Sequence, residues 1–324
     1  MSITITGGIS FSGGVDIIAP PPSEATAGWY AGGGPAPTIS TVQRMTFATD
    51  TAAATVRGPL SGTNYRMVGV ENFNYGWICG GLTGSPSSTV DRITYATDTA
   101  TASARGPLGV PANSGAGTGN STDGWIGGGY PGNMSTVQRI AYATDTATAT
   151  TKGPLSSGRA ILSSTTDSTS YGWYAGGGLG APTFARSSTI DRITFSNDTT
   201  TASIRGPLSQ AIYYLSKGTG NSTYGWFGGG YGPGPVLSTV NRITFATDTD
   251  ISSVRGPLSS ARYTVSGMGN NSYGWFAGGQ GPGIPGAKTS LINRITYAND
   301  TATAEVRGPL SEARTAGATT SGIQ

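Results

Sequence analysis

The sequence predicts an all-β protein, a six-bladed β-propeller with four antiparallel strands per blade, closed by a C-terminal strand that completes the first blade. Two repeated stretches lead to this prediction. One is an aromatic Gly-Trp segment ending in a glycine pair, as in residues 273–279, and it holds every tryptophan of the chain: Trp29, Trp77, Trp125, Trp173, Trp226 and Trp275. The spacings of these tryptophans are 48, 48, 48, 53 and 49 residues, and a fixed period near 50 residues indicates a repeat architecture.

The other stretch is an S-T-[VI]-x-R segment followed by G-P-L. From its Val or Ile to the leucine the distance is 18 residues in every copy, for example from Val240 to Leu258. A constant length indicates a fixed structural unit rather than a linker.

Each repeat contains four expected strands, illustrated here by the copy that surrounds Trp275. Strand one covers residues 262–268, and residues 269–272 form a turn rich in Gly and Asn, which tolerate positive φ. Strand two covers residues 273–279. Side chains alternate across a strand, so Trp275 lies on one face and Phe276 on the other. Apolar groups on both faces predict that this strand is covered on both sides.

The second half of a repeat supplies strands three and four. Strand three is the S-T-[VI]-x-R-[IM]-[TA]-[YF] type of segment, rich in β-branched and aromatic residues. An A-T-D-T turn leads to strand four, which ends at G-P-L because proline cannot continue a hydrogen-bonded ladder. Four such strands cannot bury two faces alone, but six sheets packed around an axis can. We expect the glycine pairs to permit close approach of the sheets and the tryptophans to fill the space between them.

The ends of the chain predict how the ring closes. Residues 27–324 form the propeller, and the first repeat lacks a strand one, whereas residues 313–322 supply an extra one. The tail therefore fits the gap and removes a free sheet edge. Residues 1–26 lie outside the repeat and are expected to form an extended arm, in which apolar residues alternate with Thr, Ser and Gly. We expect the arm to be anchored through Ile3, Ile5, Ile9 and Phe11.

The charge pattern argues against nucleic-acid binding despite a pI near 9.0. Twelve of the 19 basic residues fall at two repeat positions, so they are distributed around the ring instead of forming one patch. An aspartate lies six residues after each first-position arginine, from Asp50 to Asp300, and we interpret these as local pairing and turn chemistry. The chain has no long apolar run and no signal-type start, so no membrane insertion is expected.

The inventory of reactive residues points away from catalysis. The chain has no histidine, which excludes Ser-His-Asp and Cys-His catalysis and most zinc and copper sites. No paired carboxylate motif stands out, and the single cysteine, Cys79, is expected to be a small buried strand residue. We therefore expect no enzyme activity, no catalytic residue, no metal and no cofactor.

Length variation is concentrated in the loop between strands two and three. Between the glycine pair and the Val or Ile of strand three, the six copies have 8, 8, 7, 12, 9 and 12 residues. These loops emerge on one face of the disc, and loops on a rigid scaffold carry recognition. The candidate partner-binding residues are Tyr130, Asn133, Phe184, Arg186, Tyr231, Val236, Leu237, Ile284 and Lys288. Drift in unconstrained loops is the alternative interpretation.

The repeat resembles kelch repeats over residues 27–324, through its glycine pair, its aromatic strand and the S-x-x-R segments at residues 156–159, 259–262 and 311–314. It departs from them because the tryptophan precedes the glycines and R-G-P-L stands in the fourth strand. The absence of histidine removes the copper-oxidase chemistry of some kelch propellers. Near-identical units with A-T-D-T and R-G-P-L, together with the Gly-rich arm, resemble structural proteins of tailed bacteriophages.

The resemblance implies a virion protein, in a tail fibre, baseplate or capsid decoration, that acts in host attachment or particle decoration. The arm would bind other virion proteins within a larger assembly, and the loops would bind a host surface glycan or protein. The alternative is a free carbohydrate-binding lectin. Because the variable loops differ in every repeat, they disfavour six equivalent sugar clefts.

Overall fold

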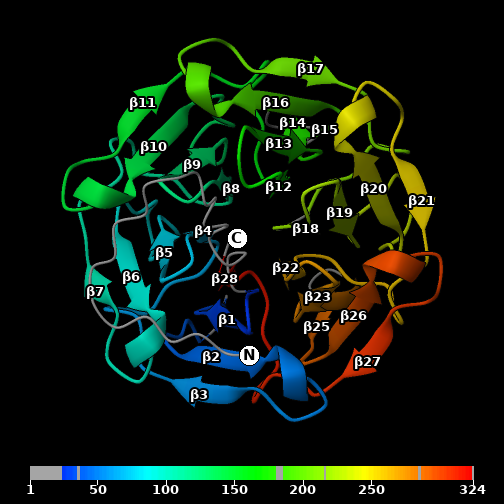
Figure 1. Ribbon diagram of the computed structural model, residues 1–324, viewed down its shortest axis with the longest axis horizontal. Helices are drawn as coiled ribbons and strands as arrows, with labels where there is room; N and C mark the ends of the chain where they lie inside the picture. Colours follow the sequence, from blue (N-terminus) through cyan, green and yellow to red (C-terminus); the bar gives the residue numbers. More distant parts are fainter. Residues whose placement is uncertain (1–23, 35–36, 180–184, 215–216, 284–285, 323–324) are drawn as a thin grey trace, which may run out of the picture.

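The chain folds into a closed ring of six blades around a central axis (Figure 1). The computed structural model describes residues 24–34, 37–179, 185–214, 217–283 and 286–322. Every blade is a four-stranded antiparallel sheet, and no α-helix occurs among these described residues. The predicted all-β propeller, with its six blades and its closing strand, is confirmed.

We number the blades 1 to 6 along the chain and give their strands from the axis outward. The innermost strands are β28 (Ala318–Ser321), β4 (Val68–Glu71), β8 (Ala116–Gly119), β12 (Ser163–Thr166), β18 (Thr219–Gly220) and β22 (Ser266–Gly269). The second strands are β1 (Ala27–Ala31), β5 (Tyr75–Cys79), β9 (Asp123–Gly127), β13 (Tyr171–Ala175), β19 (Tyr224–Gly228) and β23 (Tyr273–Ala277). The third strands are β2 (Val42–Thr46), β6 (Val90–Thr94), β10 (Val137–Ala141), β16 (Ile190–Thr194), β20 (Val240–Thr244) and β26 (Ile292–Thr296). The outer strands are β3 (Thr55–Arg57), β7 (Ser103–Ala104), β11 (Thr150–Lys152), β17 (Ser203–Arg205), β21 (Ser253–Arg255) and β27 (Glu305–Arg307).

Short elements lie in the loops and turns that connect these strands. The two longest variable loops contain small hairpins, β14 (Gly178–Leu179) with β15 (Ala185–Arg186) and β24 (Gln280–Gly283) with β25 (Gly286–Lys288). The predicted A-T-D-T turns each begin with a single 3-10 turn. These turns are η1 (Phe47–Thr49), η2 (Tyr95–Thr97), η3 (Tyr142–Thr144), η4 (Phe195–Asn197), η5 (Phe245–Thr247) and η6 (Tyr297–Asn299).

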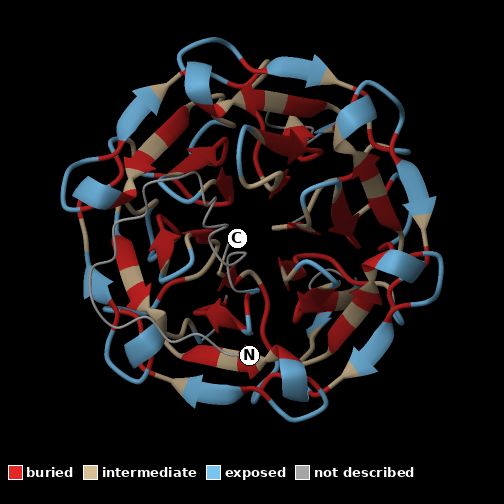
Figure 2. Ribbon diagram, in the orientation of Figure 1, coloured by how far each residue is buried: buried red, intermediate tan, exposed pale blue. Residues whose placement is uncertain are grey.

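Burial decreases from the axis to the rim (Figure 2). The outer strands are largely exposed, whereas the second and third strands are mostly buried. The apolar core is divided into clusters that each join two adjacent blades. One such cluster contains Trp226, Val240 and Leu258 of blade 5 together with Phe276 and Ile295 of blade 6. Cys79 is fully buried in another of these clusters, as its place in strand two predicts.

Strands one and two are shorter than predicted because particular residues leave the extended conformation. In blade 6, Thr264 has φ 53°, so β22 begins at Ser266 instead of residue 262. Gly278 and Gly279 have φ of 65° and 98°, and they end β23 at Ala277. In this conformation the Gly279 N–H donates to the Arg314 carbonyl of the neighbouring blade at 2.8 Å. The second glycine of each of the other pairs makes the same inter-blade bond, so the pairs do bring the sheets together.

The closing strand lies where the sequence predicts it. β28 pairs with β1 in antiparallel register, with Gly28 opposite Ser321 and Ala31 opposite Ala318. The Thr319 hydroxyl donates to the Gly267 carbonyl of blade 6 at 2.6 Å. Blade 1 is therefore built from both ends of the propeller and is hydrogen-bonded to blade 6 through its closing strand.

The repeated aspartates bridge adjacent blades, which corrects the prediction of local pairing. Asp300 of blade 6 accepts a hydrogen bond from the Trp226 indole at 2.8 Å and pairs with Arg242 at 3.0 Å and Arg255 at 3.6 Å, all three in blade 5. The reason is local geometry, because the 3-10 turn carries the aspartate out of its own sheet and toward the preceding blade. The equivalent carboxylates, which accept from Trp29, Trp77, Trp125, Trp173 and Trp275, are Asp98, Asp145, Asp198, Asp248 and Asp50.

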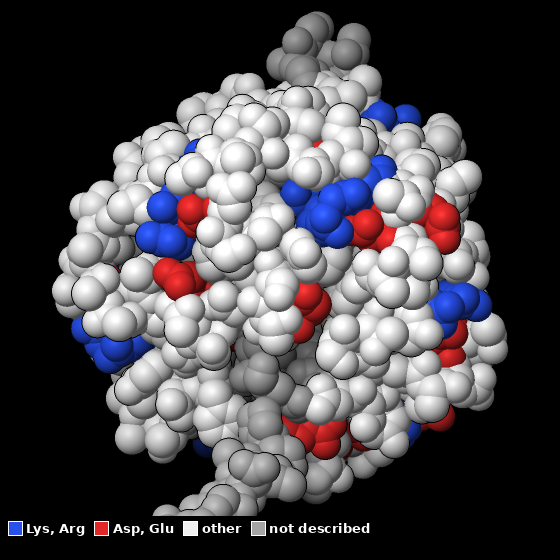
Figure 3. Space-filling model, turned by 45° about the horizontal axis from the view of Figure 1, so that its top comes forward, with Lys and Arg blue, Asp and Glu red and all other residues white. Residues whose placement is uncertain are grey.

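Charged groups consequently occur as mixed pairs on the surface. Figure 3 shows basic groups next to acidic groups, and uncharged surface lies between one such mixed group and the next. Within the described part of the chain, no helix is long and apolar enough to cross a membrane. Over the same residues, no three His, Cys, Asp or Glu side chains come together in a way that would hold a metal ion.

Candidate functional site

One end of the central axis is surrounded by six residues in the left-handed conformation. Each lies in the connection that leads into the innermost strand of its blade, at the same position of every repeat. The φ angles lie between 53° and 59°, and the residues are Arg66, Ser114, Ile161, Tyr214, Thr264 and Ala316. Two of them are β-branched, and such residues rarely adopt positive φ. The conformation costs roughly 1–3 kcal/mol at each of these sites, so the surrounding structure must impose it.

Main-chain hydrogen bonds between blades supply that constraint. The Ser114 N–H donates to the Arg66 carbonyl at 2.8 Å, and the Ile161 N–H donates to the Ser114 carbonyl at 2.7 Å. The Thr264 N–H likewise donates to the Tyr214 carbonyl at 2.8 Å. The Arg66 N–H donates to the Ala316 carbonyl at 2.7 Å, which carries the pattern across the closing blade. We call these six residues the axial ring.

The axial ring encloses a hollow of about 220 Å³, and all six of its residues line that hollow. The two sides of the hollow differ. Tyr214, Tyr231 and Tyr263 line it from blades 5 and 6, and Tyr65 and Arg66 line it from blade 2. The axial-ring residues of blades 3 and 1, Ser114 and Ala316, are small. The hollow is therefore a single asymmetric site and not a sixfold repeated cleft.

The tyrosines form one connected group. The Tyr213 and Tyr214 ring centroids lie 4.3 Å apart, and those of Tyr213 and Tyr231 lie 5.4 Å apart. The Tyr263 centroid lies 5.4 Å from that of Tyr214 and 6.4 Å from that of Tyr231. Burial raises the pKa of the Tyr213 phenol, so its hydroxyl stays a neutral hydrogen-bond donor at physiological pH.

Two arginines accompany this tyrosine group. The Arg186 guanidinium lies 5.1 Å from the Tyr213 ring centroid and 5.2 Å from that of Tyr231, and Arg66 lies 5.4 Å from the Tyr65 centroid. Thirteen of the sixteen arginines have a carboxylate within 4 Å among the described residues. Of the other three, Arg262 is buried and bonds to Gly278, Leu291 and Asn293. Arg66 and Arg186 are the remaining two. Arg66 lines the hollow and Arg186 lies against Tyr231, which also lines it. We call the hollow with these arginines and the tyrosine group the axial mouth.

The structure brings three of the candidate loop residues to this mouth. Tyr231 lines the hollow and Arg186 stacks on its ring. Tyr130 lines an adjoining hollow of about 310 Å³ together with Arg66, Ile161 and Tyr214. The two hollows share these last three residues, so they form a continuous surface.

The other predicted loop residues lie elsewhere. Val236 and Leu237 are buried, and Leu237 belongs to an apolar core cluster. Their placement supports their own loop and leaves no surface for a partner. Asn133 adopts φ 52° in its loop, and Lys288 ends β25. The predicted residues Phe184 and Ile284, and the arm residues Ile3, Ile5, Ile9 and Phe11, lie outside the described residues.

The axial ring itself was missed by reasoning from the sequence. Aligning the six repeats on their G-P-L segment gives a different residue at this position in every copy, but the neighbouring positions vary as well, so the alignment does not single it out. Positive φ at the site and convergence of the six residues on one axis are visible only in the fold.

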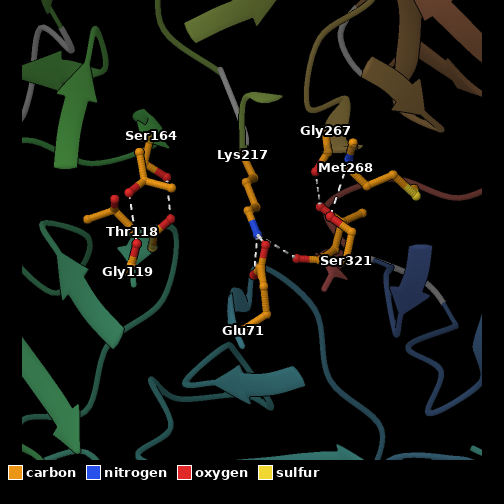
Figure 4. Close-up of polar contacts among 12 residues, drawn as sticks. Glu71, Thr118, Gly119, Ser164, Lys217, Gly267, Met268 and Ser321 are labelled. Atoms are coloured by element: carbon orange, nitrogen blue, oxygen red, sulfur yellow. Dashed lines mark hydrogen bonds and ion pairs between the residues drawn. The ribbon is translucent and has the colours of Figure 1, made fainter. Parts of the chain in front are cut away.

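An ion pair connects two blades on opposite sides of the central axis. Lys217, just before the innermost strand of blade 5, reaches across to Glu71 at the end of the innermost strand of blade 2 (Figure 4). The Lys217 ammonium contacts both carboxylate oxygens of Glu71. A second, more polar hollow of about 270 Å³ contains Glu71 and Lys217 together with Thr118 and Thr165.

The Glu71 carboxyl predicts a pH-dependent stability. Burial raises its pKa above the ordinary value of 4.5, although attraction to Lys217 opposes this. A raised folded-state pKa contributes stability below pH 4.5 that is lost as the pH rises through the folded-state value. We therefore expect the free energy of unfolding of the wild type to fall, relative to the Glu71→Gln variant, as the pH rises above 4.5. Urea unfolding of both proteins at several pH values measures this, and parallel pH profiles would contradict the assignment.

Comparison with known proteins adds no family assignment. No protein-family model matches the chain, and no curated protein matches it at a significant level. The fold and the axial site therefore define this chain as a β-propeller with one asymmetric axial mouth.

Proposed function

We propose that the chain is a non-enzymatic binding protein of a tailed-phage virion, in which the propeller presents its axial mouth for host attachment or particle decoration. The observation that carries the proposal is a contrast within each repeat between invariant contacts that join the blades and a variable residue at the axis. The Trp–Asp bridges that join the blades are the same at all six boundaries. The axial ring instead has six different residues on a rigid backbone. A uniform scaffold that presents a single non-repeating surface is typical of binding proteins.

The sequence provides the support for the virion context. The kelch-like arrangement of glycine pairs and S-x-x-R segments and the phage-like A-T-D-T and R-G-P-L units favour a repeat protein of a viral particle. The alternating apolar residues of the arm favour attachment of the propeller to other virion proteins. The described chain enters the propeller in a fixed position, because Glu24 accepts a hydrogen bond from the Asn271 N–H at 3.1 Å and Ala25 is buried.

Deletion of residues 1–22 tests the anchoring part of the proposal. We expect the shortened protein to keep the melting temperature of the propeller but to be missing from particles, because the deletion removes the apolar residues of the arm. Incorporation is measured by complementing a particle that lacks the protein and probing purified virions with an antibody. The Arg66→Gln variant is the matched control and should enter particles normally. Normal incorporation of the deleted chain would contradict the proposal.

A free carbohydrate-binding lectin is the second candidate. The tyrosine-lined axial hollow favours it, since aromatic rings with hydroxyl groups suit sugar surfaces. A glycan array combined with reconstruction of the particle separates the two candidates. A lectin would bind sugar and be absent from the particle, whereas a virion protein would be located on it.

A further inference from the structure

We infer that the axial mouth binds a carboxylated saccharide, with the carboxylate held by Arg66 and Arg186 and the sugar ring held against the tyrosine group. This inference rests on the proposed binding role of the mouth and names its ligand class. Three observations carry it: two arginines with no carboxylate partner among the described residues, a connected set of tyrosines, and a small rigid hollow.

The arginines identify the charge of the ligand. Both lie against tyrosine rings, which hold the guanidinium groups without neutralising them. A guanidinium group binds an anionic oxygen through charge-assisted hydrogen bonds, and its planar geometry matches that of a carboxylate.

The tyrosines and the size of the hollow identify what carries the carboxylate. Tyr214, Tyr231 and Tyr263 border a space of about 220 Å³, which suits one compact ring better than a folded segment. A uronic-acid-type pyranose presents apolar C–H faces, hydroxyl groups and a carboxylate on a single rigid ring. A flexible acidic peptide would lose more conformational freedom on binding to this fixed surface.

The backbone of the axial mouth is preorganised, because hydrogen bonds between blades fix its conformation. The axial ring holds Arg66 and Tyr214 in the left-handed conformation through main-chain bonds between blades. Residues held in a strained conformation by their surroundings cluster at ligand sites. The asymmetry of the ring residues also means that the protein has one such site per chain.

Ligand-observed NMR titration of the full chain tests the inference. The probes are methyl β-D-glucuronide and methyl β-D-glucoside, which differ only by the carboxylate, together with acetate and tetraglutamate. We expect the glucuronide to bind roughly tenfold or more tightly than the glucoside, as one charge-assisted hydrogen bond predicts. Arg66→Gln and Arg186→Gln should each weaken glucuronide binding by about tenfold or more. The Thr99→Glu variant lowers the net charge by the same amount at an exposed turn and should bind as the wild type does.

The other outcomes would overturn the inference. They are equal binding of glucuronide and glucoside, no binding of glucuronide, and unchanged binding by both arginine variants when thermal melts show them to be folded. Acetate or tetraglutamate binding as tightly as the glucuronide would also reject a saccharide. These titrations use isolated protein, so they are independent of particle incorporation. If the protein proves to be absent from virions, the titrations still test saccharide binding. If the titrations show no binding, the proposed virion role is not contradicted.

Discussion

Replacement of Trp226 with alanine is expected to lower the free energy of unfolding by roughly 3–5 kcal/mol, the cost of deleting a large buried side chain. The Trp226 side chain is fully buried, and its ring stacks on Tyr297 of the next blade with centroids 4.1 Å apart. Its indole N–H also donates to Asp300 at 2.8 Å. The substitution therefore leaves a cavity between two blades and removes a hydrogen bond from a buried carboxylate.

Urea unfolding followed by circular dichroism measures this effect. The control is Val254→Ala in the neighbouring outer strand, because Val254 is 58% exposed and its truncation should change stability by less than about 0.5 kcal/mol. Trp226→Phe separates the contributions, since it keeps much of the stacking and loses the hydrogen bond. An unfolding midpoint unchanged by Trp226→Ala would show that the tryptophans do not hold the blades together.

Removal of residues 318–324 should have the larger effect and prevent the ring from closing. The deletion takes away β28, whose four residues are buried, and exposes the unpaired edge of β1. We expect a loss of more than roughly 5 kcal/mol, comparable to the whole stability of many domains. The shortened chain should be unfolded or aggregated in size-exclusion chromatography and circular dichroism.

Two controls make this deletion interpretable. Removal of residues 323–324 alone leaves β28 intact and should preserve the thermal melt. A synthetic peptide of residues 313–324, added in trans, should restore the propeller signal if closure is the function of the strand. A monomer lacking residues 318–324 that melts at the wild-type temperature would contradict the role given to β28.

The fold could be predicted from the sequence because the same pattern of strand and turn residues occurs in all six repeats. Trp275 and Phe276 on opposite faces of one strand required a covered sheet, and the spare segment at the C-terminus required a gap to fill. Both expectations depend on alternation along a strand and on chain order, which are properties of the sequence. The strand pairings confirm them.

The contacts between blades were harder to predict. Asp300 lies close in sequence to Arg294 but pairs with Arg242 and Arg255 of the preceding blade, because a 3-10 turn redirects its side chain. Thr264 lies within the predicted strand one of residues 262–268, but it adopts φ 53° and its N–H donates to the Tyr214 carbonyl of the neighbouring blade. The candidate site was found only in part. Tyr231 and Arg186, which the sequence predicts as partner-binding loop residues, lie at the hollow, and their binding role stays a prediction. The ring around the hollow depends on the three-dimensional convergence of six repeats.

The axial ring has a consequence for how this protein changes over time. Main-chain hydrogen bonds between blades hold its frame, and one side-chain bond, between the Thr264 and Thr315 hydroxyls, is added to them. The side chains at positions 66, 114, 161, 214, 264 and 316 can therefore be exchanged while the main-chain bonds remain. A point mutation at any one of them changes one of the six residues around the opening. Selection can therefore tune what the opening accepts one residue at a time, and a laboratory library randomised at these six codons would explore new specificities on a constant framework.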